Sequence, residues 1–330
     1  MTTSGTIGTT VIETRKVLEH AIRRCGISAT AQTPEIVSVA LDNLYLLMLN
    51  LAAKGLNLWT IDKQIIPVVA GQPTYLMPAG TIDILNMVYS RPTYVTGVNS
   101  SSANSYTVQL SSATAIQRVG FTLTTLPTSA LTVQASNDGI TWTTVSTIAT
   151  NELPVVNQLA YYDIEISNAN GYVYWRLYAG GATFTATQLL LCSAIYDLPV
   201  TQMNRDDYTA LPNKFIQSNP SVNFYYEKLV NPQYTLWPVP NNSTNMVTIW
   251  RYRQIQDVGT LSQTLELPAR WYEAIIWQLA LRLAHELPQV DQARRQSVEM
   301  EADKWTMVSD GGETDGSPIY FRPGIGVYNR

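Results

Sequence analysis

The sequence predicts an α+β fold in which a block of short antiparallel β-strands interrupts a helical core. Apolar residues recur at helical spacing near both ends of the chain, in residues 11–25 and 272–287. Between residues 93 and 197 this period is missing, and short runs alternate apolar and polar side chains, as half-buried strands do. Charged residues make up only 14% of the 330 residues, below the roughly 25% of ordinary soluble domains. A surface so poor in charge suits β-modules and packed assemblies.

The first helical segment has clear start and stop signals. Thr10 and Glu13 have the spacing of a capping box, and Gly26 ends the helix that follows. Thr33 and Pro34 predict the start of a second helix, because the N–H that proline lacks is not used in a first helical turn. Residues 36–51 are apolar around most of the helical circumference, so we expect this helix to be buried on several sides.

Strand-like runs lie on both sides of the central block. In residues 64–88, two such runs are separated by Gly71-Gln72-Pro73, which predicts a β-hairpin. In residues 225–252, three further runs predict a small meander, with a turn at residues 238–242. We therefore expect residues 1–92 and 198–308 to form the two parts of one core.

The central block, residues 93–197, has the pattern of a separate all-β domain. Asn137-Asp138-Gly139 lies between two alternating runs, which is a strong hairpin signal. Many short strands with regular turns are typical of an antiparallel β-sandwich. We interpret the block as an insertion at a hairpin tip, a site that tolerates one.

The C-terminal part begins with helices and ends in an irregular segment. Pro268 starts one helix, and Pro288 separates it from a charged helix that runs to about Val308. Residues 309–330 are rich in Gly and Pro but also contain apolar side chains, which favours an extended arm that orders against a partner. As a hypothesis, the docking residues of this arm are Ile319, Tyr320, Phe321, Arg322, Tyr328 and Arg330.

Charge and cysteine content narrow the class of protein. The net charge is −4 and the pI about 5.3, so no long-range field attracts nucleic acid. Cys25 and Cys192 are far apart and form no metal-binding spacing, which indicates synthesis in a reducing compartment. The most apolar run, residues 37–53, is interrupted by Asp and Asn, so we expect no membrane insertion.

No arrangement of residues indicates catalysis. A nucleophile needs a base within hydrogen-bond reach, commonly His, but His20 and His285 both fall in predicted helices, and His285 lies on a polar helical face beside Glu286, as an ordinary surface histidine does. Asp138 is explained by its turn, while Asp163 and Glu165 lie on one face of a strand that we expect to face solvent. We find no phosphate-binding glycine loop and no EF-hand spacing. We therefore expect no catalytic residue, no cofactor, no metal site and no enzymatic activity.

Four local patterns resemble the head-to-tail adaptor proteins of podovirus-type phages, also called head completion or tail accessory factors. They are residues 68–78, 207–220, 236–240 and 265–279. The resemblance implies a dodecameric ring between the portal protein and the tail or nozzle protein. DNA would pass through its lumen without sequence-specific binding. It also implies a C-terminal arm, here residues 309–330, that docks on the portal, and a place in the virion after synthesis in the host cytoplasm.

The central block resembles discoidin-like (F5/8 type C) sandwiches of jelly-roll form. The resemblance lies in residues 131–142 and in Tyr174-Trp175-Arg176-Leu177. Many such modules bind glycans, which leaves an alternative open: a carbohydrate-binding or receptor-binding virion component. The candidate glycan contacts are Trp142, Tyr174, Trp175 and Tyr178. Contact of the insert with the capsid is the other partner left open.

Overall fold

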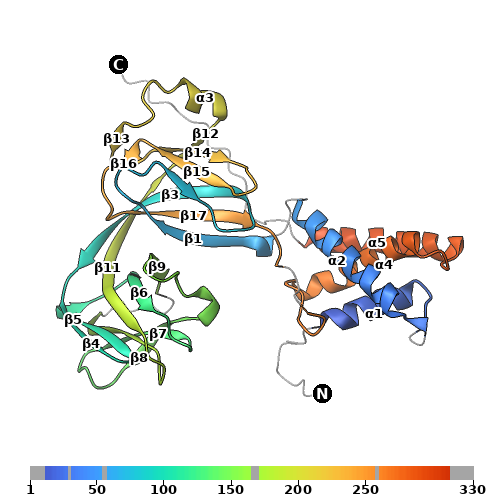
Figure 1. The fold of residues 1–330 in the computed structure, drawn as a ribbon, viewed down its shortest axis with the longest axis horizontal. Coiled ribbons are helices and arrows are strands. Elements are labelled where there is room, and N and C mark those ends of the chain that lie inside the picture. The colour runs from blue at the N-terminus through green and yellow to red at the C-terminus, as the bar shows by residue number, and fades with distance from the viewer. Residues whose placement is uncertain (1–11, 29–30, 54–57, 165–170, 257–259, 313–330) are drawn as a thin grey trace. The chain divides into compact units, whose positions relative to one another are not determined.

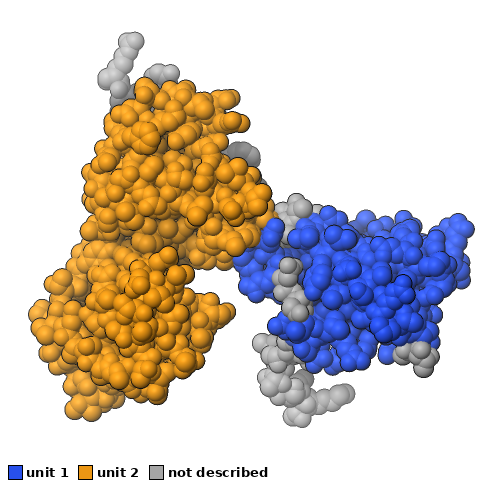
Figure 2. Space-filling view, in the orientation of Figure 1, with its two compact units in different colours: residues 1–61, 253–330 blue, residues 62–252 orange. Residues whose placement is uncertain are grey.

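A computed structural model of the chain describes residues 12–28, 31–53, 58–164, 171–256 and 260–312. It contains two compact units, residues 1–61 with 253–330 and residues 62–252 (Figure 2). The first unit is helical, and the second is built mainly from strands (Figure 1). The protein thus has mixed α and β content, with sheets that pair mostly antiparallel.

The helical unit is organised around one central helix. Its helices are α1 (Thr14–Arg24), α2 (Pro34–Ala53), α4 (Tyr272–Glu286) and α5 (Gln292–Gly311). The helix α4 packs against each of the other three, and its Leu279 and Leu283 are fully buried. The predicted helices at both ends of the chain are therefore confirmed, because their apolar stripes meet in one core.

Local chemistry sets the ends of these helices. Thr33 Oγ1 accepts a hydrogen bond from the Ile36 N–H at 3.3 Å, and Gly26 takes a φ of 88° just after α1. Asp291 caps α5 by accepting from the Arg294 N–H at 2.6 Å. The predicted capping box is not confirmed. Glu13 is the N-cap of α1 without a side-chain cap hydrogen bond, and Thr10 lies outside the described residues.

The helix α2 is more exposed than its sequence predicts. Leu44 and Leu47 are buried in the core of the unit, but Leu46 and Leu49 are 56% and 48% exposed. The expectation of burial on several sides is therefore wrong for the face that bears these two leucines. Residues 34–51, with a mean hydropathy of 1.2, are long and apolar enough to cross a membrane by length and composition alone. Core helices of soluble proteins pass the same test, and α2 packs against α1 and α4.

The β unit contains a six-stranded sheet and a four-stranded sheet. A six-stranded sheet has the order β1 (Ile61–Pro67), β17 (Met246–Arg253), β3 (Thr81–Val95), β11 (Thr185–Pro199), β6 (Arg118–Thr125) and β9 (Leu159–Asp163). A four-stranded sheet has the order β12 (Thr201–Met203), β14 (Asn223–Glu227), β15 (Gln233–Trp237) and β2 (Thr74–Leu76). Beside them lie α3 (Arg205–Ala210) and the short pair of β13 (Gln217–Ser218) and β16 (Val239–Pro240).

The hairpin predicted for residues 64–88 is wrong. The strand β1 pairs with β17, while β2 pairs with β15 through Tyr75 and Tyr234. The rings of these two tyrosines stack with centroids 5.3 Å apart in the core of this part. The meander is correct only for β14 and β15, because β17 leaves them to join the other sheet. Burial of aromatic side chains that are far apart in the sequence thus selects which strands pair.

The predicted antiparallel β-sandwich is confirmed. A five-stranded sheet has the order β4 (Val98–Ser102), β5 (Ser105–Thr114), β10 (Tyr172–Tyr178), β7 (Leu131–Ser136) and β8 (Thr143–Ile148). It shares a core with β6, β9 and β11, in which Trp175 and Leu131 meet Phe121 and Leu191. The hairpin expected around Asn137-Asp138-Gly139 is the observed pairing of β7 with β8.

Two long strands join the sandwich to the rest of the β unit. Both β3 and β11 have 15 residues, and they pair from Val88 opposite Pro199 to Val95 opposite Leu191. The expected insert boundaries at residues 93 and 197 fall inside these strands. The chain therefore enters and leaves the sandwich through paired strands, with one register shift between Cys192 and Ala194, rather than through a linker. The assignment of residues 1–92 and 198–308 to a single core stays a prediction, since the compact units divide at residues 61/62 and 252/253.

A cluster of polar side chains, part of it buried, lies at this junction. Arg118 on β6 is 3% exposed; its Nε lies 2.7 Å from Asp163 Oδ1 and its Nη1 lies 3.3 Å from Thr248 Oγ1. Lys63 on β1 pairs with the other oxygen of Asp163 on β9, so the two edge strands of the six-stranded sheet are brought together. Burial would raise the pKa of Asp163, but its hydrogen bond to Lys63 and the charge of Arg118 outweigh burial and lower it. The side chain of Asp163 remains 40% exposed, so the expectation that it faces solvent is correct in part, but its carboxylate is held in ion pairs at the junction. Glu165 lies outside the described residues.

The last helix extends beyond the predicted boundary. We expected irregular structure from residue 309, but α5 continues to Gly311, and Ser309 is buried. Residues 313–330, which include all six predicted docking residues from Ile319 to Arg330, lie outside the described residues.

Candidate functional site

The strand β10 separates the four candidate aromatic residues into two groups. Trp175 is 0% exposed, and its Nε1 donates to the Tyr172 carbonyl at 3.2 Å. Successive strand residues point to opposite faces, so Tyr174 and Tyr178 point away from the sandwich core and are partly exposed. The prediction that Trp175 contacts a ligand is therefore wrong, because its ring belongs to the core.

Trp142 joins the two tyrosines from the loop between β7 and β8. Asp138 holds this loop: its Oδ1 accepts hydrogen bonds from the backbone N–H of Ile140 at 2.9 Å and of Thr141 at 2.8 Å. These two backbone hydrogen bonds, together with one from the Ser136 hydroxyl, hold the pKa of Asp138 well below its usual range. Asp138 is thus a structural turn residue that positions Trp142.

Arg176 lies between the aromatic side chains on the outward side of β10. Its guanidinium carbon is 3.9 Å from the ring centroid of Trp142 and 4.4 Å from that of Tyr178. Its Nε donates to Gln134 Oε1 at 2.9 Å. Arg176 was not among the ligand contacts predicted from the sequence, because only aromatic residues were considered. The alternation along residues 172–178 places it on the same face as Tyr174 and Tyr178.

A row of polar side chains crosses the sheet at Arg176. The strand register places one residue of each strand in this row, namely Ser100, Thr107, Arg176, Gln134 and Thr144. Gln134 Nε2 lies 3.2 Å from Thr144 Oγ1, so part of the row is already linked by hydrogen bonds. We call this row, together with Trp142, Tyr174 and Tyr178, the outer face.

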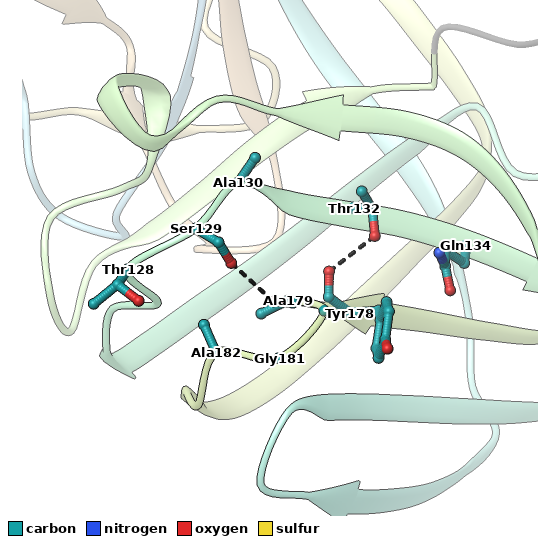
Figure 3. Close-up of a pocket in the computed structure, with 10 residues that line it drawn as sticks. Thr128, Ser129, Ala130, Thr132, Gln134, Tyr178, Ala179, Gly181 and Ala182 are labelled. Carbon is teal, nitrogen blue, oxygen red and sulfur yellow. Dashed lines mark hydrogen bonds between the residues drawn. The ribbon is translucent and has the colours of Figure 1, made fainter.

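A hollow of about 560 Å³ lies at the Tyr178 end of the outer face. Figure 3 shows Thr132 and Gln134 of β7 beside Tyr178, with Ser129 and Gly181 from the adjoining loops. Thr132 Oγ1 donates to the Tyr178 carbonyl and Ser129 Oγ to the Ala179 carbonyl, each at 2.8 Å. The first hydrogen bond links β7 to β10, and the second links the two adjoining loops to each other. The hollow is thus bordered by hydroxyls, amide groups and one aromatic ring that are held in place.

Other reactive side chains do not form a site in the described part of the chain. Burial raises the pKa of the Cys25 thiol to about 11 and that of Cys192 to about 12, which keeps both protonated at neutral pH. Among the described residues, no group of three or more His, Cys, Asp or Glu side chains could hold a metal ion.

Comparison with known proteins gives likenesses to solved structures alone. No family model matches the chain, and no curated protein matches it. The CBM32 of AlyQ in complex with 4,5-unsaturated mannuronic acid is 18% identical, with 34% of this chain and 98% of that chain covered and a TM-score of 0.24. CpGH89CBM32-5 from Clostridium perfringens, in complex with GalNAc-β-1,3-galactose, is 12% identical, with 40% and 94% covered and a TM-score of 0.22.

A third similar structure is the C-terminal domain of a chitobiase from Bacteroides fragilis. It is 15% identical, with a TM-score of 0.22, and the match covers 29% of this chain and 64% of that domain. The first two of these structures are carbohydrate-binding modules, and in all three the match covers less than half of this chain.

Proposed function

We propose that this protein is a non-catalytic binding protein whose β-sandwich recognises carbohydrate through the outer face. The observation that supports the proposal is the partly exposed cluster of Trp142, Arg176 and Tyr178, set in a row of polar side chains. Aromatic rings supply a flat apolar surface for the C–H face of a sugar ring. Hydroxyl, amide and guanidinium groups supply donors and acceptors for its hydroxyls.

The arrangement also fits what a small-ligand site requires. Such sites combine an apolar surface with a few well-placed polar groups. Tyr178 has an aromatic ring as the apolar surface, and polar groups lie on either side of it. Arg176 contacts its ring, and Thr132 and Gln134 line the hollow with it. A short saccharide could therefore lie along the outer face from Trp142 to the hollow. No residue of the site needs to perform chemistry, so the proposal includes the absence of enzymatic activity.

The competing explanation is that these side chains only stabilise the sheet as cross-strand pairs. The two explanations differ in what removal of a ring does. If the rings contact a ligand, replacing one of them abolishes binding while the protein stays folded. If the rings only form cross-strand pairs, the replacement lowers the stability of the sheet, and neither the wild type nor any variant binds a glycan.

A glycan array with the full chain tests the proposal. We expect binding to a defined set of glycans, and loss of that binding in Trp142→Ala and in Tyr178→Ala. The matched controls are Tyr196→Ala and Phe215→Ala, which remove aromatic side chains that are 68% and 75% exposed elsewhere in the β unit. Binding that survives both outer-face variants, or no binding to any glycan, would contradict the proposal.

A second candidate function is the one implied by the phage resemblance, a head-to-tail adaptor of the virion. The observation in its favour is that the helical unit leaves apolar faces uncovered. Leu46 and Leu49 are exposed on α2, and Met300, Met307 and Val308 on α5 are 69%, 75% and 61% exposed. Exposed apolar groups of this kind are typical of contact surfaces between subunits. An adaptor that bears a glycan-binding sandwich would combine both functions.

The mass of the full chain in solution tests this second candidate. Light scattering would be measured on the protein alone and mixed with the portal protein of the same particle. The adaptor function predicts a closed ring on the portal. Deletion of residues 313–330 should leave both units folded and abolish attachment. A stable trimer that ignores the portal would contradict it and favour a receptor-binding component.

A further inference from the structure

We propose that the outer face selects acidic sugars, and that Arg176 binds their carboxylate through the terminal edge of its guanidinium. This inference rests on the proposed carbohydrate binding and names the ligand class. It depends on the contacts that Arg176 makes and on the charges around it.

The contacts of Arg176 leave one part of its guanidinium open. Its flat surface stacks on Trp142 and Tyr178, at 3.9 Å and 4.4 Å, and its Nε is bonded to Gln134. Among the described residues, no acceptor or carboxylate pairs with its two Nη groups. The Nη edge is the part that pairs with carboxylates through two parallel hydrogen bonds. The stacking and the hydrogen bond to Gln134 orient this edge before a ligand arrives.

The charges of the sandwich make Arg176 its one available cation. Residues 93–196 contain just two basic residues, Arg118 and Arg176. Arg118 is buried and paired with Asp163 at the junction. The carboxylate of Asp138, in the loop that bears Trp142, is already hydrogen-bonded to Ser136, Ile140 and Thr141. Arg176 therefore has no counter-ion of its own in the described part of the sandwich, and a ligand can supply one.

The neighbouring groups suit the neutral remainder of a saccharide. Thr107 and Gln134 flank Arg176 in the polar row, and the hollow beside Tyr178 is lined by hydroxyls and backbone. These groups offer hydrogen bonds to hydroxyls without adding charge. The carboxylate would thus determine which sugars bind, and the remaining contacts would orient the ring.

Calorimetric titration of the full chain with matched ligands tests the inference. One pair is oligogalacturonate and its methyl ester, which keeps the sugar backbone and removes the charge. A second pair is sialyllactose and the methyl ester of its sialic acid carboxyl group. We expect at least one acidic member to bind about tenfold or more tightly than its neutral partner, as a bidentate charged hydrogen bond predicts. This comparison uses the wild-type protein and needs no variant to fold.

Variants of Arg176 assign the preference to its guanidinium. Arg176→Gln should abolish the difference within the pair, and Arg176→Lys should restore only part of it, because lysine cannot form the two parallel bonds. The matched control is Arg205→Gln, which removes an exposed arginine of α3 in the same unit. Circular dichroism would verify that each variant is folded.

The outcomes separate this inference from the proposed function. If neutral and acidic members bind equally and Arg176→Gln changes nothing, carbohydrate binding stands and the acidic preference is overturned. If neither neutral nor acidic glycans bind to the wild-type chain, both fail. If the preference persists in Arg176→Gln but is lost in Arg205→Gln, the carboxylate is bound elsewhere and the inference is overturned.

Discussion

At the scale of single residues, the alternation of β10 decides which side chains can meet a ligand. The sequence identified Trp142, Tyr174 and Tyr178 as candidates, and the structure places all three on the outer face. It also identified Trp175, whose ring is in the core. The period of two in residues 172–178 separates Trp175 from its neighbours and adds Arg176. The contact of Arg176 with the ring of Trp142, which comes from the loop between β7 and β8, is a long-range contact that the local pattern of β10 does not contain.

The two tryptophans of the sandwich should therefore respond differently to truncation. Trp175→Ala removes a fully buried ring and should lower the free energy of unfolding of the β unit by about 3–5 kcal/mol. Trp142→Ala should lower it by less than about 1 kcal/mol, because its ring is partly exposed in a loop. Urea unfolding of the full chain, followed by near-UV circular dichroism, measures both. Equal losses would contradict the placement of Trp175 in the core.

The ion-pair cluster around Asp163 predicts a specific dependence of stability on pH. Its folded-state pKa is lowered, so the ionised form stabilises the fold at pH values above the unfolded pKa of about 4. This contribution is lost as the pH falls through the folded-state pKa. Asp163→Asn should thus be less stable than the wild type at pH 7, and the gap should narrow below about pH 4. A gap that is independent of pH, measured by urea unfolding from pH 3 to 7, would contradict the assigned pKa shift.

At the scale of elements, the sequence predicted the presence of helices and strands better than their partners. Helical periodicity and Pro or Gly boundaries gave α1, α2, α4 and α5, and turn residues gave the β7–β8 hairpin. The partner of β2 is β15, about 160 residues further along the chain, as the contact of Thr74 with Thr235 illustrates. Local turn chemistry predicts where the chain reverses, but side-chain burial across the sheets selects the neighbour.

Close contact between β6 and β9 gives a test at this scale. A Cβ at Gly120 would lie 2.4 Å from a ring carbon of Tyr161, whose hydroxyl is hydrogen-bonded to that of Tyr94 at 2.6 Å. Gly120→Ala should displace this ring and lower the free energy of unfolding by about 1–3 kcal/mol. The control is Gly181→Ala, where a Cβ would meet nothing within 4 Å. Equal melting temperatures of the two variants would contradict the packing of β9 on β6.

At the scale of the whole molecule, the kinds of element in each part could be predicted from the sequence, but the boundaries between the parts could not. The pattern of apolar and charged residues changes at residues 93 and 197 and so indicated the sandwich, yet β3 and β11 continue through both positions. A pattern of alternating residues cannot show that two strands on either side of an insert form one ladder. The apolar character of α2 was visible in the sequence, whereas its uncovered face depends on which helices pack against it.

The different functions proposed for the two units lead to one direct test. We propose that the sandwich binds carbohydrate at the outer face and that the helical unit offers apolar surfaces to other subunits. A crystal structure of the full chain with a glycan selected on the array tests the first part of this claim. We expect a sugar ring in contact with Trp142 or Tyr178 and hydrogen-bonded within the row of Arg176 and Gln134. A saccharide bound elsewhere on the protein, with the outer face unoccupied, would contradict it.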